Sequence, residues 1–77
     1  MVRAFVMIKT GTGESEGLIE DIRALGNISE AHIVAGAYDV IAEVEAEDVY
    51  DVLQAASTQV QGLEGVIETK TYFSLDS

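Results

Sequence analysis

The chain has 77 residues, of which 48% are hydrophobic and none is cysteine or proline, and 14 acidic against 4 basic residues give a formal charge of −10. This composition excludes a disulfide framework, a thiolate metal site and an intrinsically disordered chain. No apolar run approaches the roughly 20 residues of a membrane span, and the first residues do not form a secretory signal, so we expect a cytoplasmic protein with no membrane partner.

The hydrophobic pattern predicts four strands and two helices in the order βαββαβ. A first strand covers residues 2–9, and a helix over 14–25 then places Leu18, Ile22 and Leu25 on one stripe. Two strands follow, over 28–35 and 38–45, and a last strand covers 66–75. Between the last two strands, a helix over 47–62 carries an i, i+3, i+4, i+7 stripe of Val49, Val52, Leu53, Ala56, Val60 and Leu63.

The two βαβ halves read as rough copies, since "LGNISEA" and "LEGVIET" repeat the same spacing of leucine, hydrophobe and glutamate. Two such halves predict an α+β fold, the ferredoxin-like βαββαβ plait, with a four-stranded antiparallel sheet and both helices on one face. We therefore expect residues 1–77 to form a single domain.

The strands carry hydrophobic side chains on both faces, for example Phe5 and Met7 on one face of the first strand and Val6 and Ile8 on the other. Helices can cover only one of these faces. The exposed apolar face predicts a dimer or a larger assembly, which a domain of this size also needs for stability. The alternative is that the strands are simply buried at their ends.

The turn Gly36-Ala37-Tyr38-Asp39 lies between two strands and is the most specific candidate site. Gly36 permits positive φ and a close approach of another backbone or ligand. Tyr38 offers a ring and a hydroxyl, and Asp39 offers a carboxylate that can accept a hydrogen bond from an ammonium group. Asp39 serves equally well as a cap of its own turn, so both interpretations remain open.

Other candidates are weaker. His32 is the only histidine and reads as a surface residue of a strand, and no cysteine or second histidine could complete a zinc site. The segment "KTGTGES" lacks the Gly-Lys-Ser/Thr ending of a phosphate loop, and the acids of "EVEAED" are typical of a solvated face. We therefore expect no catalytic residue, no metal and no cofactor.

Three segments carry a resemblance to a known family: "AFVMIKTGTG", "ISEAHIVAGAYDVIAEVEAED" and "VQGLEGVIETKTYFSL". Together they resemble the effector-binding (RAM) domain of Lrp/AsnC transcription regulators over nearly the whole chain, here without the helix-turn-helix that normally precedes it. The hydrophobe-x-Gly-x-Tyr-Asp-hydrophobe hairpin is the most specific part. The chain departs from the family pattern in two places. The turns that often hold Pro-Gly in the family contain no proline here, and Ala35 stands where a threonine is common.

The resemblance implies a non-enzymatic sensing module that dimerises through its sheets and builds rings of dimers, with an amino acid or similar small effector at the contact between dimers. The ligand-binding residues that it implies are Gly36, Ala37, Tyr38, Asp39, Thr69 and Thr71. For the two threonines, cross-strand packing is the alternative interpretation.

Full-length Lrp/AsnC proteins are possible partners, and a structural partner that binds no ligand is the second hypothesis. A small dimeric enzyme of the same fold is a weaker third hypothesis, because no nucleophile and base are visible. We expect no direct nucleic-acid binding, because four basic residues are spread along an acidic chain. The acidic excess also suits a cytoplasm of very high salt.

Overall fold

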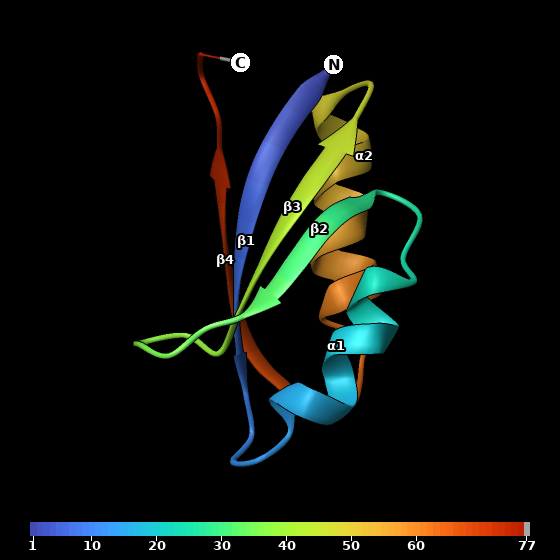
Figure 1. Ribbon diagram of the computed structural model, residues 1–77. Coiled ribbons are helices and arrows are strands. Elements are labelled where there is room, and N and C mark those ends of the chain that lie inside the picture. Colours follow the sequence, from blue (N-terminus) through green and yellow to red (C-terminus); the bar gives the residue numbers. More distant parts are fainter. Residues whose placement is uncertain (77) are drawn as a thin grey trace.

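The computed structural model describes residues 1–76 and has the predicted order of strands and helices. The elements are β1 (Val2–Thr10), α1 (Ser15–Arg23), β2 (Ile28–Ile33), β3 (Val40–Ala46), α2 (Val49–Leu53), the π-helix η1 (Gln54–Val60) that continues α2, and β4 (Val66–Phe73). The sheet is antiparallel with the strand order β2-β3-β1-β4, and both helices lie on one of its faces (Figure 1). The predicted ferredoxin-like plait is confirmed.

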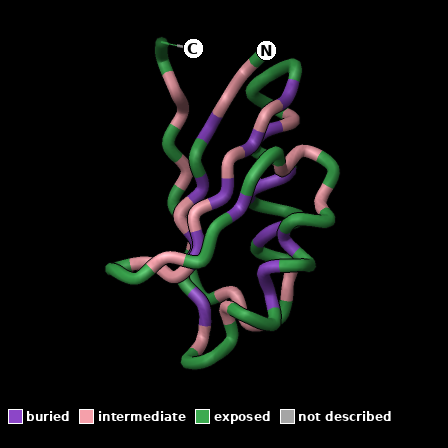
Figure 2. Tube along the Cα trace, in the orientation of Figure 1, coloured by how far each residue is buried: buried purple, intermediate pink, exposed green. Residues whose placement is uncertain are grey.

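The core forms between the helices and the even-numbered residues of the central strands. Ala4, Val6 and Ile8 of β1 are fully buried, and Val40, Ala42 and Val44 of β3 are buried beside them. Side chains of a strand alternate between its faces, so the odd-numbered residues point away from the helices. Figure 2 shows this alternation of buried and partly exposed residues along β1 and β3.

Helix α1 covers the β2 side of this core with Leu18, Ile19 and Ile22, all buried. Leu25, predicted on the same stripe, lies beyond the end of the helix and packs against the core while partly exposed. The helix is thus shorter than the sequence pattern suggested, because its last predicted turn already forms the connection to β2.

The second helix differs from its prediction in geometry and in its buried stripe. It begins after Asp48, whose side chain accepts a hydrogen bond from the Asp51 N–H at 2.9 Å, and from Gln54 on it is a π-helix. Val49 and Leu53, predicted to be buried, are 49% and 45% exposed. The reason is the π-helical half of the helix. Its i→i+5 hydrogen bonds give more than 3.6 residues per turn, so the side that faces the core differs from the side that a uniform 3.6-residue period predicts.

The buried stripe of this helix instead consists of Val52, Ala55, Ala56 and Val60. Its end is fixed by close packing of the backbone at Gly62. A Cβ atom on Gly62 would lie 2.6 Å from the carbonyl oxygen of Thr58, so a larger residue would force the end of the helix to shift.

Two valines of α2 give a matched test of which side of the helix is buried. Val52→Ala removes two buried methyl groups and should lower the free energy of unfolding by about 2 kcal/mol. Val49→Ala removes the same atoms from an exposed position and should change it by less than about 0.5 kcal/mol. Urea denaturation at one fixed protein concentration measures both values, and equal losses would mean that Val49 is buried after all.

Candidate functional site

Residues 34–39 connect β2 to β3 and contain the predicted binding turn. The Val34 N–H donates a hydrogen bond to the Asp39 carbonyl oxygen at 2.9 Å, which closes the hairpin and leaves residues 35–38 as its tip. Strand β2 therefore ends two residues earlier than the sequence predicted, and β3 begins two residues later. Figure 1 shows that the hairpin projects from the sheet on the side away from the helices, where another molecule can reach it.

The Asp39 carboxylate anchors the hairpin to the end of β1. Its Oδ2 atom accepts hydrogen bonds from the Thr10 N–H at 2.9 Å and from the Thr10 hydroxyl at 3.3 Å. Thr10 is 6% exposed and follows an irregularity in the pairing of β1 with β4, so its N–H needs a partner. Asp39 thus holds a neighbouring strand rather than capping its own turn, and Oδ1 has no hydrogen-bond partner among the described residues.

Tyr38 extends from the hairpin across β1 to β4. Its hydroxyl donates a hydrogen bond to Glu68 Oε2 at 3.2 Å, and Glu68 is paired with Lys9 in the sheet. Because Lys9 is one of the odd-numbered residues of β1, this contact lies on the side of the sheet that the helices do not cover. The Tyr38 ring is partly buried, which leaves one part of it accessible.

Thr69 and Thr71 lie on the opposite side of the sheet from the Tyr38 contact. They pair with Ile8 and Val6, which face the helices, and the Thr69 hydroxyl accepts a hydrogen bond from Gln61 Nε2 at 2.6 Å. Within one chain the structure therefore brings Tyr38 and Asp39 together but not the two threonines.

Gly36 and Ala37 form the exposed tip of the hairpin. Positive φ values occur only at Gly13 and Gly65 among residues 1–76, so Gly36 does not use the backbone freedom of glycine. A Cβ atom at Gly36 would meet no atom within 4 Å. Nothing in the chain itself requires glycine at this position.

The face of the sheet away from the helices, here called the outer face, combines apolar and charged side chains. Register and alternation place the following residues on it: Arg3, Phe5, Met7 and Lys9 of β1; Glu30 and His32 of β2; Ile41, Glu43 and Glu45 of β3; Glu68, Lys70 and Tyr72 of β4. Phe5 and Tyr72 form a cross-strand pair and are 36% and 55% exposed. An aromatic pair exposed to this extent is typical of a surface that contacts another molecule.

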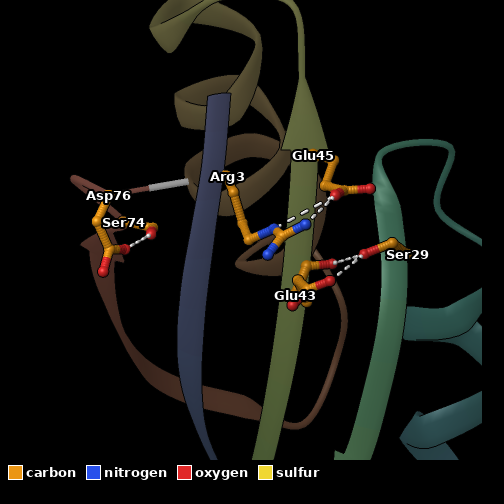
Figure 3. Close-up of polar contacts among 6 residues, drawn as sticks. All are labelled: Arg3, Ser29, Glu43, Glu45, Ser74 and Asp76. Carbon is orange, nitrogen blue, oxygen red and sulfur yellow. Dashed lines mark hydrogen bonds and ion pairs between the residues drawn. The ribbon is translucent and has the colours of Figure 1, made fainter. Parts of the chain in front are cut away.

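Charged side chains on the outer face make polar contacts between neighbouring strands (Figure 3). Arg3 reaches from β1 to Glu45 of β3, with its Nη2 atom 3.0 Å from Glu45 Oε2. The hydrogen bond to Glu45 and the nearby Glu43 carboxylate raise the pKa of Arg3 above its usual value. Ser29 donates a hydrogen bond to Glu43 Oε2 at 3.0 Å. The charge run that the sequence indicated as solvated is therefore half-buried at Glu43 and Glu45.

An open hollow of about 330 Å³ lies along the free edge of β2, at a position that the sequence did not suggest. It is lined by Arg23, Ile28, Ser29, Glu30, Ala31 and His32. The Arg23 guanidinium donates two hydrogen bonds to the Ala31 carbonyl oxygen, at 3.0 and 3.2 Å, and so covers this edge. His32 Nε2 lies 3.1 Å from Glu30 Oε1 on the exposed surface.

Thr10 and Glu68, the partners of the hairpin, were not found from the sequence. Thr10 has no local signal, because its contact with Asp39 spans 29 positions of the chain. Glu68 follows from strand alternation, which places it on the outer face beside Lys9 once the register is known. In the part of the chain that the structure describes, no cluster of three or more acidic, histidine or cysteine side chains could hold a metal ion. No described helix is long and apolar enough to cross a membrane.

Comparisons with known proteins identify one protein family. The profile of the Lrp/AsnC ligand binding domain matches residues 3–77. The crystal structure of TTHA0845 from Thermus thermophilus is 31% identical and has a TM-score of 0.94, with 100% of this chain and 96% of that chain covered. FFRP-DM1 is 28% identical with a TM-score of 0.90, and the match covers 97% of this chain and 100% of that one.

A more distant structure is similar in fold alone. The transcriptional regulator NMB0573 of Neisseria meningitidis, solved in complex with L-Met, is 13% identical with a TM-score of 0.84. The match covers 96% of this chain but 49% of that one. No curated protein sequence matches the chain.

Two substitutions test whether Asp39 holds the hairpin. Asp39→Ala leaves the buried Thr10 N–H without a partner and should lower the free energy of unfolding by about 1–3 kcal/mol. Asp39→Asn keeps an oxygen at the same place and should cost less than about 1 kcal/mol. Urea denaturation gives both values. If the alanine variant is as stable as the asparagine variant, Thr10 does not depend on this carboxylate.

Proposed function

The chain belongs to the Lrp/AsnC ligand-binding domain family, and we propose that it is a non-enzymatic module that senses an amino acid or a similar small molecule and assembles with other copies. The observation that carries the proposal is the family match over residues 3–77, which includes the hairpin. The complex of a Neisseria regulator of the same fold with L-Met supports the ligand class. Sensing in the cytoplasm fits the acidic composition.

The hairpin has the chemistry that an amino acid requires. The free Oδ1 atom of Asp39 is positioned to accept a hydrogen bond from an α-ammonium group, because Thr10 fixes the carboxylate through Oδ2. The exposed part of the Tyr38 ring offers an apolar surface to a side chain. Gly36 and Ala37 allow the ligand to approach the backbone closely. This would explain the small residues at the tip, since packing within the chain does not require glycine at position 36.

A second chain has to complete this site if Thr69 and Thr71 take part. The two threonines face the helix side of edge strand β4, whereas Tyr38 lies on the outer face. A ligand contact that includes both groups therefore places the effector between copies of the chain. In that arrangement the effector changes assembly directly, because it binds only where two copies meet.

The second candidate is a structural partner that binds no effector and joins full-length Lrp/AsnC proteins. The satisfied contacts of the hairpin favour it, since Asp39 is held by Thr10 and Tyr38 by Glu68. An enzyme of this fold is the weakest candidate, because the two hydroxyl–carboxylate contacts near the hairpin, Thr10 with Asp39 and Tyr38 with Glu68, hold the hairpin to β1 and β4.

The first test is a thermal-shift screen against the amino acids. A ligand that binds only the native state stabilises it by about 2.7 kcal/mol at roughly 100 times its Kd, which raises the Tm of a domain of this size by several degrees. Asp39→Asn should then weaken binding of the same ligand by about 10-fold to 150-fold in calorimetry, because a charge-assisted hydrogen bond is lost. A flat screen across all amino acids would favour the structural partner instead.

The second test concerns nucleic acid. The charge of −10 opposes binding to a polyanion, and three of the four basic residues lie on the outer face of one sheet rather than along a recognition helix. The purified chain should therefore leave duplex DNA unshifted in a gel assay at about 50 mM salt. A shift that disappears with rising salt would show direct binding and contradict this part of the proposal.

A further inference from the structure

An α-amino acid carries two charges, and Asp39 provides a partner for only one of them. Its Oδ1 atom can accept a hydrogen bond from the α-ammonium group, because Oδ2 is held by Thr10. The α-carboxylate needs a donor or a cation, since a charge that leaves water without a partner is unfavourable. Two carboxylates of the chain, Asp39 and Glu68, already lie at the hairpin and repel a third. An amino acid bound there therefore requires a cation beside the hairpin.

Only one of the four basic residues of the chain lies beside the hairpin. Arg3 is held in its ion pair on the outer face, and Arg23 covers the edge of β2. Lys70 lies opposite Met7 of β1, two residues further from the hairpin than Lys9. Lys9 is therefore the cation that a ligand at the hairpin meets first.

Lys9 stands between the two contacts that hold the hairpin. It directly precedes Thr10, whose N–H donates a hydrogen bond to Asp39 Oδ2 at 2.9 Å. It also pairs in the sheet with Glu68, which accepts the hydrogen bond from the Tyr38 hydroxyl at 3.2 Å. Tyr38 reaches Glu68 from the β3 side, so it crosses β1 at the level of Lys9. The lysine side chain therefore begins on the same side of the sheet as the Tyr38 contact.

The Lys9 ammonium group is exposed and has no partner within the chain. Among residues 1–76 it makes no ion pair and no side-chain hydrogen bond. The two carboxylates beside it are engaged elsewhere, Asp39 with Thr10 and Glu68 with Tyr38. An ammonium group on a flexible four-carbon stem can turn toward a ligand at the hairpin without a change in the backbone. Lys9 is thus available to an anionic group.

We propose that Lys9 binds the α-carboxylate of the ligand while Asp39 accepts a hydrogen bond from its α-ammonium group. The inference rests on the proposed function and adds a specificity-determining residue to the same site. Lys9 thereby decides which small molecules the hairpin accepts, namely those in which both the amino group and the carboxyl group are free.

The covalent structure of an α-amino acid suits this pair of residues. Both charged groups are attached to one carbon atom, so their partners in the protein have to lie close together. Thr10 brings the two partners together, because it follows Lys9 in the chain and holds the Asp39 carboxylate. An amine without a carboxylate leaves Lys9 unpaired, and an acid without an amino group leaves Asp39 unpaired. The site therefore favours the zwitterion over both.

A comparison of each amino acid with its α-amide tests this assignment. At about pH 6.5, below the α-amino pKa of about 7.7, the amide keeps its ammonium group but has no carboxylate. The unchanged chain should bind the acid more tightly than the amide, and Lys9→Gln should reduce this preference by roughly threefold to tenfold. Lys9→Arg should retain most of it. Both members of each pair enter the thermal-shift screen, and calorimetry on those that bind gives each Kd.

Lys70→Gln is the matched control, because it removes the same charge from the same face of the sheet. Both lysines are exposed, and they occupy successive outward-facing rows of the β1–β4 pair. Lys70→Gln should change the preference for the acid over the amide by less than about twofold. An effect as large as that of Lys9→Gln would mean that net charge sets the preference, and it would overturn the assignment to Lys9.

The remaining outcomes separate this inference from the proposed function. If an amino acid binds and Lys9→Gln leaves its preference over the amide unchanged, the carboxylate is held by other donors, such as the backbone N–H groups of the tip, and the inference is wrong while the proposed function stands. An amide that binds the unchanged chain as tightly as its acid leads to the same conclusion. A screen in which no amino acid binds would overturn the proposed function, and this inference with it.

Discussion

One layer of helices on a four-stranded sheet is the constraint on which the rest of the structure depends. The helices bury the even-numbered side chains of β1 and β3, and no described element covers the other side. The outer face therefore exposes apolar and charged side chains together. Its aromatic pair, Phe5 and Tyr72, is typical of a surface that contacts another molecule, and its charged side chains keep that surface compatible with water.

The hairpin is linked to this face through two side chains. Asp39 fixes its base to the end of β1, and Tyr38 fixes its tip to Glu68 of β4. Both contacts are made by residues that also have the chemistry for an amino-acid ligand. In the proposed function, an amino acid that draws Tyr38 away from Glu68 removes a hydrogen bond from a carboxylate that lies beside Lys9 on the outer face. The proposed ligand site and the outer face therefore share this contact.

Much of the fold could be predicted from the sequence, because strand and helix periods are local properties. The order of elements, the plait and the place of the hairpin follow from hydrophobic runs and glycines. The buried stripe of α2 could not be predicted, since the switch to a π-helix at Gln54 depends on packing rather than on a residue pattern. The same holds for the site. The contact of Asp39 with Thr10 is tertiary, and the side of the sheet on which Thr69 and Thr71 lie depends on the register of β4.

A crystal structure of the chain grown with a saturating amino acid is the most direct test of the claim that this is a sensing module assembled from copies. The expected result is a second copy on the outer face of the sheet and ligand density within hydrogen-bond distance of Asp39 or Tyr38. A structure with the outer face turned to solvent, or with the amino acid held in the hollow beside β2, would contradict it.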